Sequence, residues 1–141
     1  MENLLLAEDI REKIIAHCLK GYPKEACGIL AGQICRLAGG ISKIELAYPL
    51  ENISDSPAMC YEIDSKRQLE IQKELRAKKL DMVAIYHSHT ESDAYPSKKD
   101  LELAYYPDSF YLIISLKNKA DPQMRAFKIV DGNILKADII G

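Results

Sequence analysis

The sequence predicts a mixed α/β domain in which helices flank a largely antiparallel sheet. Two observations carry this prediction. Short apolar runs with strand character alternate with helical segments, and an Asp-Gly pair between the last two apolar runs is typical of a tight hairpin. The 141 residues contain no repeat and no linker, so residues 1–141 are expected to form a single domain.

The first half of the chain predicts a helix followed by two paired strands. Ile10, Ile14 and Cys18 recur at helical spacing, and Gly21 followed by Pro23 ends the helix. An apolar run bounded by proline and glycine indicates a buried strand, and a glycine pair leads to its antiparallel neighbour. The expected elements are a strand at 3–6, a helix at 8–20 and strands at 26–34 and 41–48.

The second half begins with a long polar loop over residues 49–63, and loops of this length in compact domains tend to be functional. Ser65 and Gln68 resemble a capping box that opens a charged helix ending near Lys79. The hairpin turn is expected at Asp131-Gly132. The remaining expected elements are a helix at 97–105 and strands at 82–89, 110–116, 125–130 and 134–139.

Composition excludes several classes of function. The net charge is -2 and no basic stripe is present, so the sequence gives no indication of nucleic-acid binding. No stretch reaches the ~18 apolar residues of a membrane span, and the N-terminal apolar run is too short for a signal peptide. The four cysteines form no C-x-x-C pair, which favours reduced thiols and a cytoplasmic location.

A histidine pair ends the strand predicted at 82–89. Side chains alternate across a strand, so His87 and His89 point to one face, where their ring nitrogens can meet at one metal ion. Ser88 is expected to point the other way. A polar loop follows directly, which suits a functional site.

Asp100 is the expected third ligand. Ser97 has the features of a helix N-cap, and Asp100 stands three residues later in the first helical turn. The partial positive charge of the helix start favours a carboxylate there. A catalytic zinc ion takes three such protein ligands and leaves its fourth position open. Each residue alone would be an ordinary surface or capping group, and only the combination indicates a site.

His87-Ser88-His89, Ser97 and Asp100 match the JAMM (MPN+, Mov34) signature of zinc isopeptidases, and the chain resembles a small stand-alone prokaryotic member. The segment from Glu25 to Gly32, EACGILAG, is similar to the glutamate-bearing segment of that family. The loop containing Asn52 and the Tyr61–Asp64 stretch also look similar. The resemblance covers residues 3–138 and implies the JAB1/MPN fold, which is similar to that of cytidine deaminases.

The resemblance assigns a role to each residue of the signature. His87, His89 and Asp100 would hold one Zn²⁺ per chain, although the same ligands also suit Fe²⁺ or Co²⁺. Glu25 would act as general base and acid, and Ser97 would stabilise the oxyanion of the intermediate. For Cys27 a role as a small core residue is preferred, with a place beside the metal site as the alternative.

The resemblance also implies a substrate: the peptide or isopeptide bond after the C-terminal Gly-Gly of a small β-grasp ubiquitin-like or sulfur-carrier protein. A non-catalytic scaffold of the same fold and a RadC-like protein are alternatives. A zinc nucleobase deaminase is disfavoured because the chain lacks a Pro-Cys-x-x-Cys run. The sequence leaves open which amine is released and whether the chain forms a homodimer.

Overall fold

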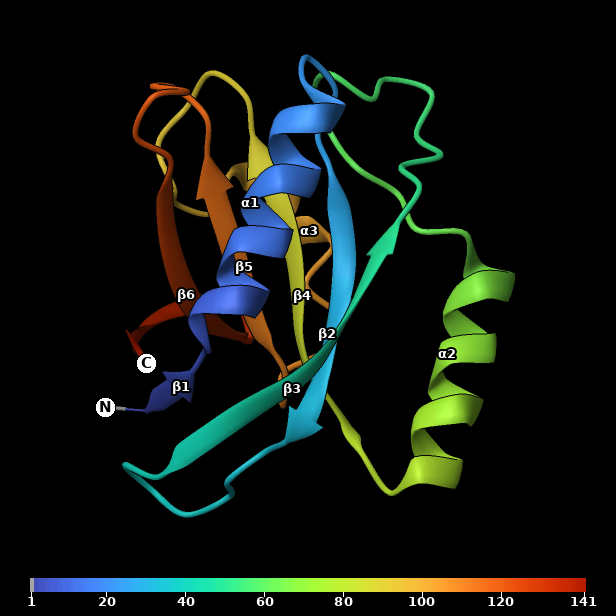
Figure 1. Ribbon diagram of the computed structural model, residues 1–141, viewed down its shortest axis with the longest axis vertical. Helices are drawn as coiled ribbons and strands as arrows, with labels where there is room; N and C mark the ends of the chain where they lie inside the picture. The colour runs from blue at the N-terminus through green and yellow to red at the C-terminus, as the bar shows by residue number, and fades with distance from the viewer. Residues whose placement is uncertain (1) are drawn as a thin grey trace.

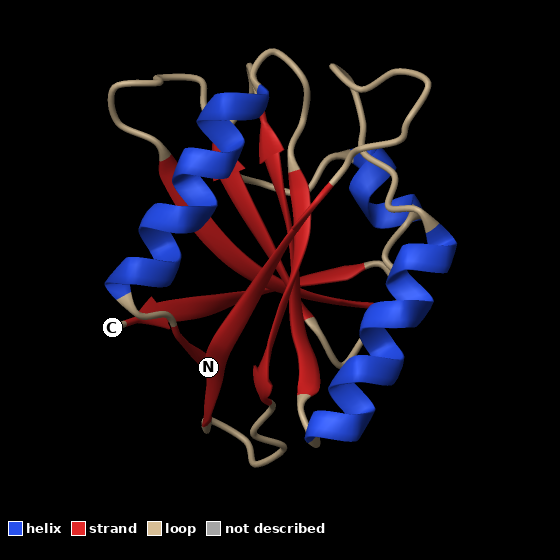
Figure 2. Ribbon diagram, turned by 45° about the vertical axis from the view of Figure 1, so that its right-hand side comes forward, coloured by secondary structure: helices blue, strands red, loops and turns tan. Residues whose placement is uncertain are grey.

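A computed structural model describes residues 2–141 of the chain. In the described part, seven strands and three helices alternate along the sequence (Figures 1 and 2). Their bounds are β1 Asn3–Leu5, α1 Glu8–Gly21, β2 Cys27–Gln33, β3 Ile41–Leu50, α2 Ser65–Lys78, β4 Asp81–His89, α3 Lys98–Glu102, β5 Phe110–Ser115, β6 Gln123–Val130 and β7 Asn133–Ile140.

The strands close into a barrel in the order β1-β3-β2-β4-β5-β6-β7. Four of the pairings are antiparallel, and β1 with β3, β1 with β7 and β4 with β5 are parallel. The prediction of a mixed α/β fold is confirmed. A sheet simply flanked by helices is an incomplete description, because the short strand β1 bridges β3 and β7 and closes the sheet.

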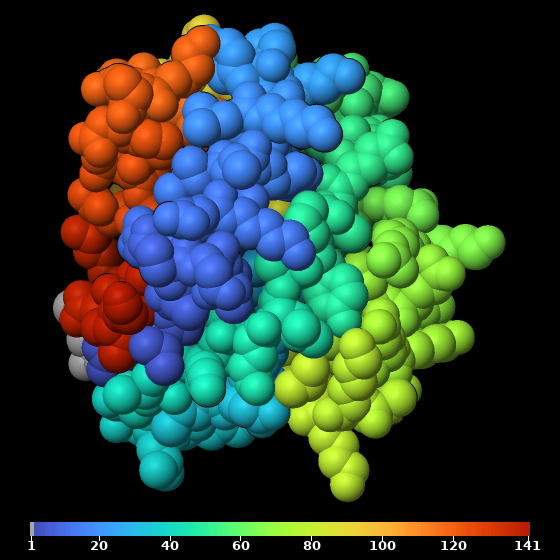
Figure 3. Space-filling view, in the orientation of Figure 1, coloured from blue at the N-terminus to red at the C-terminus, as the bar shows by residue number. Residues whose placement is uncertain are grey.

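The two faces of the strands bury different cores. One face packs with α1 in the main hydrophobic cluster, which contains Ile14, Tyr86 and Phe110. The other face packs under α2 through Ile71 and under α3 through Ile85. Figure 3 shows α1 and β3 covering one side of the molecule, with α2 projecting beside them. The face under α2 and α3 is also the face on which the histidine pair lies.

Two helix boundaries differ from the prediction. The N-cap of α2 is Asp64, whose carboxylate accepts a hydrogen bond from the Arg67 N–H at 3.2 Å, so the capping box expected at Ser65 is wrong. Helix α3 ends at Glu102 and not near Tyr105. Beyond it the Tyr106 N–H donates to the Tyr111 hydroxyl at 3.1 Å, so a tertiary contact replaces the helical bond.

Strands β2 and β3 show why particular residues occur in them. A Cβ on Gly28 would lie 2.3 Å from the Tyr86 ring and 2.6 Å from the Tyr48 carbonyl oxygen, so only glycine fits between the strands. Pro49 lies within β3, which extends two residues beyond the predicted end. Proline is tolerated there because this part of β3 pairs only with β2 and its other edge is free.

The remaining predicted strands agree with the structure to within a few residues. Both turn residues between β6 and β7 have positive φ, 52° at Asp131 and 78° at Gly132, as expected for a tight hairpin. None of the helices in residues 2–141 is long and apolar enough to cross a membrane. At the top of Figure 1 lie the turn after α1 and the loops after β3, β4 and β5, and the first three of these connections line one cavity.

Candidate metal centre

Strand β4 presents the histidine pair as its alternation predicts. His87 and His89 lie on the face under α2 and α3, and both are buried, with 1% and 4% exposure. Ser88 between them points to the opposite side. Its hydroxyl accepts a hydrogen bond from the Ala26 N–H at 2.8 Å, and its own N–H donates to the Ala26 carbonyl at 3.0 Å. The segment that carries Glu25 is therefore attached to β4 between the two histidines.

Helix α3 fixes the carboxylate of Asp100. The Ser97 hydroxyl accepts from the Asp100 N–H at 3.1 Å, and Asp100 Oδ2 accepts from the Ser97 N–H at 2.9 Å. This reciprocal pair is the predicted capping box. It orients the carboxylate so that Oδ1 faces His87 and Oδ2, besides accepting from Ser97, faces His89.

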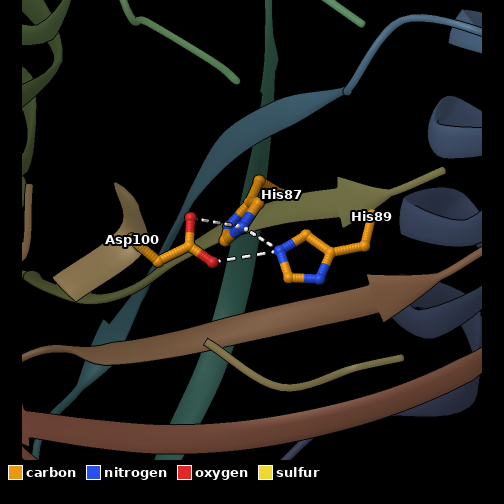
Figure 4. A group of neighbouring side chains, drawn as sticks. All are labelled: His87, His89 and Asp100. Atoms are coloured by element: carbon orange, nitrogen blue, oxygen red, sulfur yellow. Dashed lines mark hydrogen bonds and ion pairs between the residues drawn. The ribbon is translucent and has the colours of Figure 1, made fainter. Parts of the chain in front are cut away.

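The three side chains converge from two elements (Figure 4). Asp100 Oδ1 lies 3.1 Å from His87 Nε2, and Asp100 Oδ2 lies 3.0 Å from His89 Nε2. The two Nε2 atoms are 3.1 Å apart. All the ligand atoms lie within 4.8 Å of one another, so the described residues bring together the predicted metal-binding group.

The hydrogen bonds of the rings favour a cation between them. His89 Nδ1 lies 2.9 Å from the Asp93 carbonyl oxygen, which can only accept, so this nitrogen carries the proton. The lone pair of a neutral His89 is then on Nε2, facing His87 and Asp100. Electron pairs aimed at one point repel unless a proton or a metal ion lies among them. The donor set, two imidazoles and one carboxylate, is that of a zinc site.

The pKa values of Asp100 and His89 show the same attraction for positive charge, whereas that of His87 is dominated by burial. Burial alone would raise the pKa of Asp100, but hydrogen bonds from His87 and His89 hold it well below its usual range. Burial lowers the pKa of His87. For His89 the effect of burial is outweighed by its hydrogen bonds to Asp100 and to the Asp93 carbonyl, and the pKa is raised.

Glu25 lies just before β2 and is buried, with 8% exposure. Burial raises its pKa to about 7; the charge of His89 acts in the opposite direction and that of Asp100 in the same direction. A carboxyl group that gains and loses a proton near neutral pH suits acid–base chemistry. Glu25 also lines a cavity of about 380 Å³ together with Met59, Thr90 and other residues of the three converging connections.

Cys27 is fully buried, and its thiol donates to the Glu51 carbonyl oxygen at 3.7 Å. Burial, with a further contribution from the charge of Glu25, raises the pKa of this thiol to about 12. The thiol is neutral and enclosed, and β2 also sets Cys27 directly opposite His87 on β4, so both interpretations of Cys27 stay predictions.

Two residues near the centre had no predicted role. The Tyr61 ring stacks on His87 with centroids 4.5 Å apart and planes at 24°. The Asn52 side chain bonds to the backbone of Glu25 and of its own loop. The sequence signals for them were their place in an unusually long polar loop and the resemblance of that loop to the corresponding loop of the family.

Comparisons with known proteins agree with this geometry. Residues 7–130 match the Prok-JAB family, described as prokaryotic homologues of the JAB domain. The chain is 34% identical to the CysO-cysteine peptidase of Mycobacterium tuberculosis over 136 residues, which is 96% of this chain and 89% of that protein. It is 36% identical to the desampylase of Haloferax volcanii over 117 residues, 80% of this chain and 81% of that protein.

A solved structure shares both fold and sequence. The solution structure of a Desulfitobacterium hafniense protein superposes with a TM-score of 0.82 at 34% identity, covering 99% of this chain and 92% of that one. The predicted resemblance to small stand-alone JAMM proteins is thereby confirmed. The chain belongs to the Prok-JAB family of prokaryotic JAB-domain homologues.

Proposed function

We propose that the chain is a zinc-dependent peptidase that hydrolyses the bond after the C-terminal Gly-Gly of a small ubiquitin-like or sulfur-carrier protein. The convergence of His87, His89 and Asp100 beside a buried glutamate carries this proposal. The relatives support the peptidase activity, since one is named a CysO-cysteine peptidase and another a desampylase.

Zinc fits the donor set better than magnesium or calcium, which prefer oxygen ligands alone. When bound, the ion would lower the pKa of a water molecule and polarise the scissile carbonyl group. His87 and His89 would supply their Nε2 atoms and Asp100 a carboxylate oxygen. The Asp93 carbonyl would keep His89 in the tautomer that a metal ion requires.

Glu25 would move the proton. Its carboxylate accepts a proton from the attacking water and returns it to the departing amine, which its pKa of about 7 permits in both directions. The departing amine must then lie beside Glu25. We therefore assign the cavity of about 380 Å³ that Glu25 lines to the leaving group.

The burial of the centre supports the proposal of a glycine tail in the substrate. His87 and His89 are almost inaccessible, so a chain that brings its carbonyl carbon to them has to be narrow. Two glycines at the end of a tail add no side chains to an extended backbone. A β-grasp protein with such a tail is the partner that this geometry favours. A cytoplasmic location and a homodimer stay predictions.

A cleavage assay tests the proposal. The substrates are a β-grasp sulfur-carrier protein joined through its C-terminal glycine to the amine of cysteine and, separately, to the side-chain amine of lysine in a peptide. Release of the intact Gly-Gly terminus, read by mass spectrometry, is expected with zinc and not after chelation. A fully metallated protein that cleaves neither adduct, but binds them, would instead indicate a scaffold.

Ser97→Ala is expected to lose both stability and turnover. The hydroxyl accepts from the Asp100 N–H and can still donate its own proton to the substrate oxygen. Loss of an N-cap costs about 1 kcal/mol, or about 3–5 °C in Tm. Asp64→Ala removes the cap of α2 and is the matched control, with a similar loss of Tm and unchanged kcat. Equal kcat in the two variants would leave Ser97 only its capping role.

A further inference from the structure

The side chain of Asn52 uses its full hydrogen-bonding capacity on the backbone around the metal centre. Its amide nitrogen donates its two hydrogens to the carbonyl oxygens of Glu25 at 2.8 Å and Cys60 at 3.0 Å, and the Pro57 carbonyl oxygen shares one of them at 3.4 Å. Its oxygen accepts from the N–H groups of Ser54 and Glu62, both at 3.0 Å. The amide orientation is unambiguous, because carbonyl oxygens only accept and backbone N–H groups only donate.

These bonds hold the backbone of Glu25 from the side opposite to β4. On one side, the next residue, Ala26, bonds through both its N–H and its carbonyl to Ser88 between the metal-binding histidines. On the other side, the Glu25 carbonyl accepts from Asn52, and the Glu25 N–H donates to the Pro57 carbonyl at 2.7 Å. The position of the glutamate relative to the histidines therefore depends on the loop as well as on the strand.

The same amide also fixes the backbone on both sides of Tyr61. The preceding residue, Cys60, accepts a hydrogen bond from Asn52, and the following residue, Glu62, donates one to it. Between these two anchors the Tyr61 ring stacks on His87. One side chain thus bonds to the backbone beside both the proposed base and the aromatic ring that stacks on His87.

We propose that Asn52 is a positioning residue that sets Glu25 relative to the metal centre. It touches no reacting atom; it acts through the backbone of Glu25 and of the loop over residues 52–62. The catalytic part of this inference rests on the proposed peptidase function. The structural part does not rest on that function: the Asn52 amide connects the backbone of Glu25 to the loop over residues 52–62.

Asn52→Ala removes all of these bonds. Asn52→Asp keeps the acceptors for Ser54 and Glu62 but sets a carboxylate oxygen against the carbonyl groups of Glu25 and Cys60. Displacement of a catalytic group by about 1 Å lowers the rate about 100-fold. Both variants are therefore expected to lose about 100-fold in kcat, with KM within about threefold of wild type and one zinc ion still bound per chain.

Ser42→Ala is the matched control for destabilisation. Ser42 is buried at the opposite end of β3, and its hydroxyl accepts from the Cys35 N–H at 2.9 Å. This variant removes one buried hydrogen bond; it is expected to lose Tm, by less than Asn52→Ala, and to retain wild-type kcat. All activities are compared well below the Tm of each variant, so a difference in kcat does not reflect unfolded protein.

Amide hydrogen exchange provides a readout without turnover. Asn52→Ala is expected to speed exchange of the Glu25 and Glu62 amides at least tenfold relative to wild type, while Ser42→Ala leaves them unchanged. If both amides of Asn52→Ala exchange at the wild-type rate, the inference that Asn52 holds the two backbone segments together is wrong. Faster exchange with wild-type kcat in both Asn52 variants would overturn the positioning role. If the wild type itself cleaves no adduct, the proposed function fails. The exchange rates alone then test whether Asn52 holds the two backbone segments together.

Discussion

Glu25→Gln is expected to bind zinc as tightly as the wild-type protein and to lose cleavage of the Gly-Gly adduct by about 10²–10⁴-fold in kcat. Glutamine has nearly the same shape, and both backbone bonds of residue 25, to Pro57 and from Asn52, are kept. It cannot accept and return a proton. The loss is thus specific to proton transfer, and kcat is measured beside the zinc content of the same sample.

Glu102→Gln is the control for loss of one negative charge. Glu102 is exposed and lies at the end of α3, two residues beyond Asp100. Its kcat and zinc content are expected to match those of the wild type. Retained cleavage in Glu25→Gln would remove Glu25 from the mechanism. Loss of zinc from Glu25→Gln would mean that the carboxylate contributes to zinc binding, so the loss of cleavage could not be assigned to proton transfer.

His87→Ala is expected to lose the metal itself. It leaves one histidine and one carboxylate, and the zinc content should fall from one per chain to near zero. A ligand that binds only the folded state stabilises it by about 4 kcal/mol at a thousandfold excess over Kd. Zinc should therefore raise the Tm of the wild type strongly and leave that of His87→Ala unchanged, as measured by calorimetry.

His17→Ala is the matched control, because it removes the remaining histidine of the chain. His17 lies on α1, where its Nδ1 is 2.6 Å from the Tyr86 hydroxyl, outside the metal centre. The variant should keep one zinc and its stabilisation. Asp100→Asn preserves the size of the side chain and is the second ligand variant, to be used if His87→Ala misfolds. It is also expected to bind zinc more weakly than the wild type. Full metallation of both ligand variants would contradict the ligand assignment.

Local sequence patterns sufficed to predict which three side chains come together as the candidate metal ligands. His87 and His89 share a face because strand side chains alternate, and Asp100 is fixed because Ser97 caps a helix three residues earlier. Both rules act within a few residues, and only the short loop between β4 and α3 has to join them. The helix cap at Asp64 shows the limit of such patterns, since Ser65 next to it is also a good capping residue.

The closure of the barrel and the role of Asn52 could not be predicted, because both depend on contacts between segments that are distant in the sequence. Barrel closure requires Leu4 to pair with both Ser42 and Ile139, and nothing local to a three-residue strand indicates this. The role of Asn52 was hidden for the same reason, because its main partner, Glu25, is 27 residues away. An asparagine in a polar loop is usually solvated, so only the folded backbone reveals its use.

The way in which β1 closes the barrel also determines where the ends of the chain emerge. Asn3 pairs with Ile41 and Asp138, at the end of β3 away from Leu50, while Leu50 pairs with Cys27 and Cys27 with His87. The first and last strands of the described chain, β1 and β7, therefore lie at the same side of the molecule, as Figure 1 shows, and the candidate metal ligands lie toward the other side. A tag, a surface linkage or a fused domain at either end would leave the approach of a large protein substrate clear.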